Sequence, residues 1–480
     1  MSALGPGGAV RTAAIANLGC KVNQAEMEAA ARLLRERGVV VRDLTDATTV
    51  MAADLVLVNT CTVTSTADAK SRQVVRRARR ANPDARLVVT GCAVQVSRTA
   101  FAEADPDARL IDNRAKDGLQ AELDALLGAG QDGQPIDRAL PTLSGVEIEG
   151  IADGRASVER TRAFVKVQDG CSFFCTYCII PAARGPERSL SPEIVVRDVR
   201  RALRAGHREI VLTGINIGTY DGGWSERGFR GAHTRSALTL AGLVRRILDE
   251  TAVERIRLSS IEPQHVDDEL LRVWSDGAPR TLPHVHLPLQ SGDDRVLRRM
   301  GRRYSSADYA SVVDRVRAAI PGVAVHGDVI VGFPTEDEAA WRRSLAFIGS
   351  IGFAGIHVFR YSARPGTAAI RMTGQVDEAT KKRRSAELLA LAAEARAARA
   401  RDSIARTTDV LFERRLDDGR WVGHAADHVL VAVELRRDGS SLENEIGRVR
   451  IEAVDPDVRD RAVGRLKRLT DRPIGDASAA

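Results

Sequence analysis

Much of this chain alternates short apolar runs with amphipathic segments of helical period, and this alternation limits its fold more than any other feature. In the first 130 residues, "AAIANLGC", "DLVLVNTC" and "ARLVVTGC" have the pattern of buried parallel strands, and segments such as "QAEMEAAARLLRERG" have that of helices. Strands that alternate with helices predict a doubly wound α/β domain with a parallel sheet. We expect this N-terminal domain to span residues 1–130.

The alternation stops at a stretch rich in Gly, Pro, Asp and Ser and then resumes. We expect a linker over residues 131–158 and a second α/β domain over residues 159–400. The strand candidates of this second domain are "AFVKVQDG", "EIVLTG", "RIRLSS", "HVHLPL", "VHGDVIVG" and "GIHVFRYS". Such βα units predict an open (βα)6 barrel, with its chemistry at the carboxyl ends of the strands.

The C-terminal part of the chain has a different period. A long helix, "DEATKKRRSAELLALAAEARAARARDS", is followed by the short runs "TTDVLFERR", "GRWVGH", "HVLVAVEL" and "GRVRIEAV". Short strands separated by turn residues predict a small β-barrel over residues 404–470. Residues 471–480 are expected to form a disordered tail.

Composition restricts the cellular setting. The chain is 44% hydrophobic and 28% charged, as is ordinary for soluble proteins. No apolar run approaches the roughly 18 residues of a membrane span, and the first residues lack a signal-peptide core. We therefore expect a cytoplasmic protein without a membrane partner, in which cysteines act as ligands or catalysts rather than in disulfides. The net charge of +7 weakly favours an anionic partner such as RNA.

One short segment holds half of the six cysteines. Cys171, Cys175 and Cys178 form C-x3-C-x2-C directly after the first strand of the second domain. Three thiolates are one ligand short of a closed tetrahedral zinc site, and no histidine precedes His207. An iron–sulfur cluster held by only three thiolates keeps one iron open for an exchangeable ligand, and we favour this interpretation. A zinc knuckle or buried free thiols are the alternatives.

The other three cysteines are far apart in the sequence but share a position. Cys20, Cys61 and Cys92 each follow a predicted parallel strand. Because ligand sites of open α/β sheets lie outside the carboxyl ends of the strands, we expect the three thiols to converge on one edge. We interpret them as ligands of a second cluster with an open iron. Three buried core cysteines are the alternative.

With both triplets in place, the sequence resembles the radical S-adenosylmethionine (SAM) methylthiotransferases over nearly its whole length. C-x3-C-x2-C with an aromatic residue, Tyr177, before the last cysteine is the signature of the radical SAM superfamily. The upstream triplet, the linker and the small C-terminal barrel, which is an RNA-binding TRAM domain in this family, narrow the resemblance. The segments "NLGCKVNQAEME" and "VLFERRLDDGRWVGHAADHVLV" are similar to the branch that acts on threonylcarbamoyladenosine in tRNA.

The resemblance implies an enzyme that adds a methylthio group to C2 of N6-threonylcarbamoyladenosine, next to the tRNA anticodon. Its cofactors would be two [4Fe–4S] clusters and SAM. Reductive cleavage of SAM at the first cluster would give a 5′-deoxyadenosyl radical that removes hydrogen from C2, and the second cluster would deliver the sulfur. The implied partners are the tRNA anticodon loop and a reductant such as flavodoxin or ferredoxin, while the sulfur source stays open. The alternatives are isopentenyladenosine in tRNA or a ribosomal protein as substrate and, more distantly, a non-catalytic iron–sulfur RNA-binding protein.

Glycines and polar residues at strand ends would complete the SAM site in this resemblance. The expected cofactor contacts are Tyr177, Gly214, Asn216, Glu262, Gln290, Ser291 and Gly332. Glycine lets a nucleoside approach the backbone closely, and polar groups can bond to its ribose and amino acid parts. For each residue an ordinary turn is the alternative. No catalytic residue beyond the cluster ligands is expected.

Two further features concern the RNA substrate. A helical segment carries a basic patch that either binds phosphate or is a solvated face, formed by Lys70, Arg72, Arg76, Arg77, Arg79 and Arg80. A threonylcarbamoyl carboxylate requires a cation or several amide donors, because burying it unpaired costs several kcal/mol. Arg184, Arg188 and Arg303 are the candidate cations by their position after barrel strands.

Overall fold

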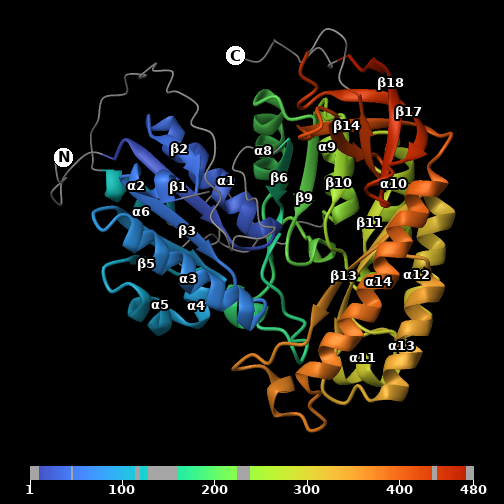
Figure 1. The fold of residues 1–480 in the computed structure, drawn as a ribbon, viewed down its shortest axis with the longest axis horizontal. Helices are drawn as coiled ribbons and strands as arrows, with labels where there is room; N and C mark the ends of the chain where they lie inside the picture. The colour runs from blue at the N-terminus through green and yellow to red at the C-terminus, as the bar shows by residue number, and fades with distance from the viewer. Residues whose placement is uncertain are drawn as a thin grey trace.

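The computed structural model of the chain describes residues 10–44, 47–113, 119–127, 161–223, 238–434 and 440–471. Figure 1 shows three parts in chain order: a parallel-sheet domain in blue, an open barrel from green to orange, and a small closed barrel in red. The predicted fold class is confirmed. The predicted linker and residues 472–480 of the predicted tail lie outside the described residues, and the predicted domain limits stay predictions.

The N-terminal domain is a five-stranded parallel sheet with the order β2-β1-β3-β4-β5. Its strands are β1 (Thr12–Asn17), β2 (Val40–Asp43), β3 (Leu55–Thr60), β4 (Arg86–Gly91) and β5 (Arg109–Ile111). Its helices are α1 (Lys21–Glu36), α2 (Ala47–Met51), α3 (Ser65–Ala81), α4 (Cys92–Val96), α5 (Arg98–Ala104) and α6 (Leu119–Leu127). Along β3, Leu55 and Leu57 pack into one core while Val56 and Val58 pack into another. Helices therefore cover both faces of the sheet, as the continuous apolar strands indicated.

The central part is an open barrel of parallel strands. Its strands are β6 (Arg162–Lys166), β9 (Glu209–Thr213), β10 (Arg255–Leu258), β11 (His284–His286), β12 (Ala324–Val331) and β13 (Gly355–Arg360). They form two three-stranded sheets, which a parallel bridge between Ser260 and His286 joins. The helices are α7 (Ile180–Arg184), α8 (Pro192–Arg204), α9 (Leu240–Glu250), α10 (Asp268–Asp276), α11 (Asp294–Met300), α12 (Ser306–Ala319), α13 (Glu338–Ile351) and α14 (Glu378–Asp402). Every one of the predicted barrel strands is present.

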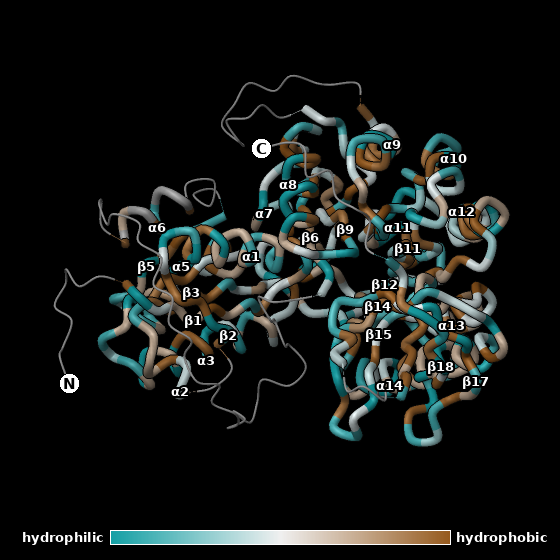
Figure 2. The backbone as a smooth tube through the Cα atoms, turned by 90° about the horizontal axis from the view of Figure 1, so that it is seen from above, coloured by the Kyte–Doolittle hydropathy of each residue, from teal (hydrophilic) through white to brown (hydrophobic). Residues whose placement is uncertain are grey.

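The C-terminal part is a closed barrel with the order β14-β15-β16-β18-β17. Its strands are β14 (Thr407–Arg415), β15 (Trp421–Ala425), β16 (Leu430–Val433), β17 (Ile446–Val454) and β18 (Arg461–Leu469). The sequence analysis missed β18, because basic residues occupy its outward positions and leave only a faint apolar alternation. Phe412 and Trp421 belong to the core of this barrel. In Figure 2 the apolar residues likewise gather inside each part.

Ion pairs fix both outer parts to the open barrel. On the N-terminal side, Lys166 of β6 pairs with Glu26 of α1 at 3.1 Å. On the other side, Arg208 pairs with Glu445 at 3.0 Å, and Arg255 donates to the carbonyl oxygen of Asp409 at 3.1 Å. Since Arg208 and Arg255 lie where β9 and β10 begin, the C-terminal barrel covers the amino ends of the strands. None of the described helices is both long and apolar enough to cross a membrane.

Candidate iron–sulfur and SAM site

The C-x3-C-x2-C cysteines lie in a loop at the carboxyl end of β6, after the short strand β7 (Gln168–Asp169). Gly170 begins this loop with a φ of +70°, and the carbonyl oxygen of Pro186 lies 1.9 Å from where a Cβ of residue 170 would stand. Only glycine permits this close approach. Burial raises the pKa of Cys178, and charge on Cys175 and Cys171 raises it further, which indicates that the three thiols lie near one another.

The chemistry of these thiols fits an iron–sulfur cluster. Burial raises the pKa of Cys171 to about 11 and that of Cys178 to about 12, so these two thiols are protonated when no metal is bound. A bound metal reverses this preference, because its positive charge stabilises the thiolate. Three cysteines around one point leave one iron of a cubane without a protein ligand.

An arginine that the sequence analysis missed lies beside this loop. Arg302 donates a hydrogen bond from Nη1 to Sγ of Cys175 at 3.5 Å and another from Nε to the hydroxyl of Tyr304 at 3.0 Å. It also pairs with Glu262, whose pKa is raised by burial despite this pairing. A buried guanidinium at this place offsets the negative charge of a thiolate-bound cluster. The sequence offered no signal to separate Arg302 from its neighbour Arg303.

The second triplet gathers at one edge of the N-terminal sheet, as predicted. Cys20, Cys61 and Cys92 follow β1, β3 and β4, which are neighbours in the sheet. The three thiols lie close together, since the charges of Cys20 and Cys92 both act on the pKa of Cys61 and that of Cys92 acts on the pKa of Cys20. Desolvation dominates and raises the pKa of Cys61 to about 12. A metal cation would stabilise these thiolates in the same way as those of the other loop.

Buried polar contacts connect the two cysteine sites. Asn23 accepts hydrogen bonds on Oδ1 from Sγ of Cys20 at 3.2 Å and from Nη2 of Arg184 at 2.8 Å. Asn113 donates from Nδ2 to Sγ of Cys92 at 3.5 Å and to the carbonyl oxygen of Ala183 at 2.8 Å. Arg184 and Ala183 belong to α7, directly after the C-x3-C-x2-C loop. These contacts hold the second triplet in a fixed place next to the first.

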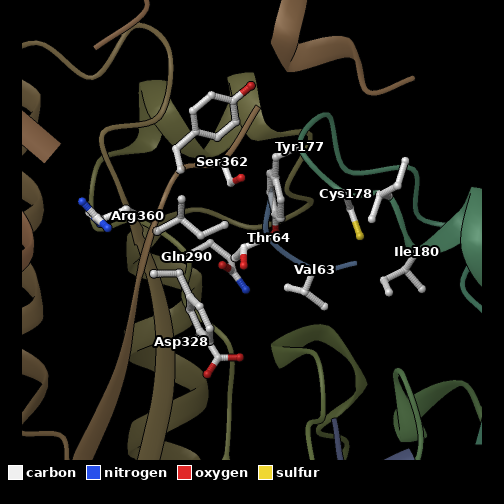
Figure 3. A pocket seen from close by; sticks show the side chains of 13 residues that line it. Val63, Thr64, Tyr177, Cys178, Ile180, Gln290, Asp328, Arg360 and Ser362 are labelled. Atoms are coloured by element: carbon white, nitrogen blue, oxygen red, sulfur yellow. The ribbon is translucent and has the colours of Figure 1, made fainter. Parts of the chain in front are cut away.

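A cavity of about 180 Å³ borders Cys178 of the first triplet and the segment that follows Cys61 of the second. Thr64, shortly after Cys61, lines it on the side of the N-terminal domain, and Tyr177 and Cys178 line it on the side of the loop. Gln290, after β11, and Asp328, within β12, line it on the barrel side together with Arg360 and Ser362 at the end of β13 (Figure 3). A molecule bound here would touch residues next to both sets of cysteines.

The sequence comparisons identify the family. Residues 165–348 match the model of the Radical SAM superfamily, and residues 12–112 match that of Uncharacterized protein family UPF0004. The chain is 40% identical over 380 residues to threonylcarbamoyladenosine tRNA methylthiotransferase MtaB of Bacillus subtilis, covering 79% of this chain and 80% of the relative. The chain belongs to the radical SAM methylthiotransferase family. It is thus an enzyme, and its radical SAM domain implies a [4Fe–4S] cluster and SAM.

Other relatives and one solved structure are also similar to this methylthiotransferase. It is 36% identical to the MtaB protein of Thermotoga maritima, over 78% of this chain and 80% of the relative. It is 33% identical to tRNA-2-methylthio-N(6)-dimethylallyladenosine synthase of Maricaulis maris, over 92% and 94%. The radical SAM methyltransferase TsrM of Kitasatospora setae, with cobalamin and a [4Fe–4S] cluster, aligns with a TM-score of 0.51 and 16% identity, over 75% and 77%. This last likeness shows the fold alone.

The remaining strand-end residues differ in their surroundings. The side chain of Asn216 is buried, and neither its oxygen nor its nitrogen has a hydrogen-bond partner within the described residues, as a polar group that awaits a ligand would show. Gly214 packs against Gln168, and Gly332 packs against Lys381. Ser291 accepts a hydrogen bond on Oγ from the N–H of Asp293 at 3.3 Å. Gly214, Ser291 and Gly332 thus contact the methylthiotransferase's own chain, and their role towards SAM stays a prediction.

The arginines suggested for carboxylate recognition are engaged elsewhere. Arg184 and Arg188 both pair with Asp169, at 2.9 and 3.4 Å, and Arg303 lies over the ring of Phe173. Lys21, which the sequence analysis used only as a branch marker, is an exposed residue next to Cys20. Its pKa is lowered to about 8, by desolvation first and then by the charge of a nearby arginine, while Asp328 acts in the opposite direction.

The basic patch on α3 is only partly paired. Arg72 pairs with Asp68 at 2.7 Å, and Arg79 pairs with Asp105 at 2.8 Å. Lys70, Arg76 and Arg80 are exposed and have no ion pair within the part of the chain that the structure describes. Because α3 begins shortly after Cys61, these three cations lie on the element next to the second triplet.

Proposed function

We propose that this methylthiotransferase modifies tRNA, adding a methylthio group to C2 of N6-threonylcarbamoyladenosine at position 37, next to the anticodon. The single observation that carries the proposal is the 40% identity to a relative of that name across most of both chains. The structure supports it with a cavity lined both by Cys178 of the first triplet and by Val63 and Thr64, which closely follow Cys61 of the second. The electron donor (flavodoxin or ferredoxin) and the sulfur source stay predictions.

In this proposal Cys171, Cys175 and Cys178 hold the first cluster. Arg302 offsets the cluster's negative charge through its hydrogen bond to Sγ of Cys175. When bound, this cluster and SAM supply the radical chemistry that opens the unactivated C2–H bond. Tyr177 and Gln290 form part of the wall around the adenosine, and the orphaned amide of Asn216 binds a polar group of SAM. The enclosing wall limits access of water to the reacting atoms.

We further propose that Cys20, Cys61 and Cys92 hold a second [4Fe–4S] cluster. The supporting geometry is that the segment after Cys61 lines the same cavity as Cys178, because sulfur has to reach the carbon from which hydrogen was removed. Asn23, Asn113 and Arg184 hold the two sites at a fixed separation through the contacts described above. Such fixed geometry favours transfer between two bound groups.

Recognition of the threonylcarbamoyl carboxylate is assigned to Lys21 in this proposal. Lys21 is an exposed residue beside Cys20, and its ammonium group is close enough to Asp328, on the cavity wall, for that charge to act on its pKa. A carboxylate that enters this partly desolvated place gains a cation already positioned by α1. An isopentenyl group offers no such anion, so Lys21 would favour the first substrate over the second.

Substitution of single cysteines tests the two assignments separately. Cys61→Ala is expected to keep reductive cleavage of SAM to 5′-deoxyadenosine while losing the methylthio product. Cys175→Ala is expected to lose both, because the first cluster no longer forms. Iron content should fall by about half in either protein. If the Cys61→Ala protein forms the full amount of methylthio product, the second triplet has a structural role and does not hold a cluster needed for the reaction.

Nucleosides of a deletion strain test the substrate. Mass spectrometry of its tRNA should show threonylcarbamoyladenosine in place of the methylthio form, with isopentenyl-type nucleosides unchanged. Loss of methylthio-isopentenyladenosine instead, or of a ribosomal-protein modification alone, would contradict the substrate while leaving the chemistry intact.

A further inference from the structure

Histidine side chains gather where the open barrel meets the C-terminal barrel, on the side away from the cysteine loop. His284 lies at the start of β11 and His326 near the start of β12, while His424 and His428 come from β15 and the turn that follows it. The ring centroids of His284 and His428 are 4.7 Å apart, and those of His326 and His428 are 5.1 Å apart. Neither the proposed function nor the relatives' names assign a role to this cluster.

We propose that His284, His326 and His428 bind a divalent transition metal, with zinc as the expected ion. One nitrogen from each ring can be chosen so that all three lie within 4.8 Å of one another. Two imidazole nitrogens on one tetrahedral zinc ion are about 3.4 Å apart, given Zn–N bonds of about 2.0–2.1 Å. Side-chain shifts of about 1 Å therefore bring the three rings into the coordination sphere of one ion.

The hydrogen bonding and charge state of these rings suit metal ligation. Nδ1 of His284 is buried without a partner, and none of the three rings makes a side-chain hydrogen bond within the described residues. A buried polar atom without a partner is costly unless a ligand binds it. Burial lowers the pKa of all three histidines, that of His326 to about 3, so each ring is neutral and offers a lone pair.

A fourth histidine, His424, lies beside the other three and is oriented as an additional ligand. Nδ1 of His424 contacts both oxygens of Glu413 at 3.1 Å, and its ring centroid is 4.5 Å from that of His428. Histidines that bind metals commonly use one nitrogen for the ion and the other for a carboxylate. His424 or a water molecule would then complete a tetrahedral site around the ion.

Access and charge also permit a cation. A cavity of about 270 Å³ reaches His326, His424 and His428. Its lining also includes two ion pairs, Asp427 with Arg399 at 3.0 Å and Asp460 with Arg396 at 2.8 Å, so these arginines add no unpaired positive charge. Arg257, whose charge acts on the pKa of His284 after burial does, pairs with Glu209 at 2.9 Å. Imidazole-only sites suit zinc, copper and nickel, and three protein ligands with an open or water-filled fourth position are common for zinc.

The neighbouring group of His286, Asp328 and His357 is a different case. Oδ1 of Asp328 already contacts Nε2 of His286 and Nδ1 of His357, both at 2.9 Å. Asp328 also lines the substrate cavity. This second group is therefore satisfied within the protein and belongs to the proposed active site, and it is not part of the metal proposal.

The site would tie the two barrels together. His284 and His326 come from the open barrel, and His428 comes from the small one, in a turn with a φ of +69° at this residue. That conformation is rare for a residue other than glycine. An ion that bridges the two parts would stabilise their docking by mass action, since it binds the docked form alone.

Metal analysis combined with X-ray absorption tests the proposal on the full chain with its iron–sulfur clusters reconstituted. After zinc addition and removal of excess, we expect about one zinc per chain, with only nitrogen or oxygen neighbours at about 2.0–2.1 Å. His428→Asn, which suits the positive φ, should lose the zinc and keep the iron. His207→Gln, outside the cluster, is the matched control and should keep both metals.

Three results would overturn the proposal. The first is wild-type protein that retains no zinc, and the second is a zinc shell with sulfur at about 2.3 Å, which would place the ion on cysteines. The third is undiminished zinc in His428→Asn. If that variant does not fold, X-ray absorption of zinc in the wild-type protein tests the proposal instead. Imidazole ligands around the zinc would support it, and any other set of ligands would contradict it.

Discussion

At the scale of single residues, Asp169 shows how the site is held together. Its carboxylate lies between Lys166, Arg184 and Arg188, and the first two cations also contact Glu26 of the N-terminal domain. Arg184→Met removes one charge from this buried network. Because uncompensated buried charge remains, we expect a loss of about 3–5 kcal/mol in the free energy of unfolding, measured by denaturant titration. Arg197→Met on α8, with an exposed side chain, should change it by less than about 0.5 kcal/mol.

Lys21 gives a prediction with a defined pH dependence. Its pKa of about 8 means that the ammonium form is present below pH 8 and is lost as the pH rises. Affinity for an anticodon stem-loop with threonylcarbamoyladenosine should therefore be constant below pH 8 and fall above it, as fluorescence anisotropy can measure. Lys21→Arg should remove this fall, because arginine keeps its charge. The affinity for an unmodified stem-loop should not change with pH in this range. An equal loss of affinity for that RNA above pH 8 would show that Lys21 does not recognise the carboxylate.

At the scale of elements, the unpaired cations of α3 predict a phosphate contact. Substitution of Lys70, Arg76 and Arg80 by Glu should weaken tRNA binding at least tenfold. It should also make the slope of log affinity against log salt concentration smaller in size by about two to three. Reversal of the exposed Arg342 on α13 is the control and should leave both quantities nearly unchanged. Unaltered binding by the triple variant would identify the patch as a solvated face.

The elements also show what the sequence could and could not reveal. Parallel strands were predictable because both of their faces are buried and read as continuous apolar runs, as in β3. The convergence of Cys20, Cys61 and Cys92 was predictable because carboxyl ends of parallel strands share an edge. Arg302 and the histidine cluster were not predictable, because their neighbours come from distant segments and no local spacing marks them. Lys21 was visible in the sequence, but only the fold brings it near Asp328.

At the scale of the whole molecule, the C-terminal barrel docks beside a buried carboxylate. Glu209 contacts Arg255 at 2.8 Å and Arg257 at 2.9 Å, and these charges lower its pKa although burial opposes them. A lowered carboxyl pKa stabilises the fold above the unfolded value of about 4.3, and this stabilisation is lost as the pH falls below it. Glu209→Gln should cost about 3–5 kcal/mol at pH 7, and the difference from wild type should shrink as the pH falls below about 4.5. Denaturant titrations of both proteins in parallel measure this, and a difference that grows on acidification would contradict it.

The central claim, that two cysteine-held clusters act together on threonylcarbamoyladenosine, is tested most directly with purified components. Anaerobically reconstituted protein, SAM, a reductant and a sulfide source are incubated with an equal mixture of tRNA carrying threonylcarbamoyladenosine and tRNA carrying isopentenyladenosine. Mass spectrometry of the digested tRNA then gives both methylthio products at once. We expect 2-methylthio-N6-threonylcarbamoyladenosine to dominate with the wild-type protein and to be absent with Cys61→Ala. Predominant methylthiolation of isopentenyladenosine, or equal product from the Cys61→Ala protein, would contradict the account.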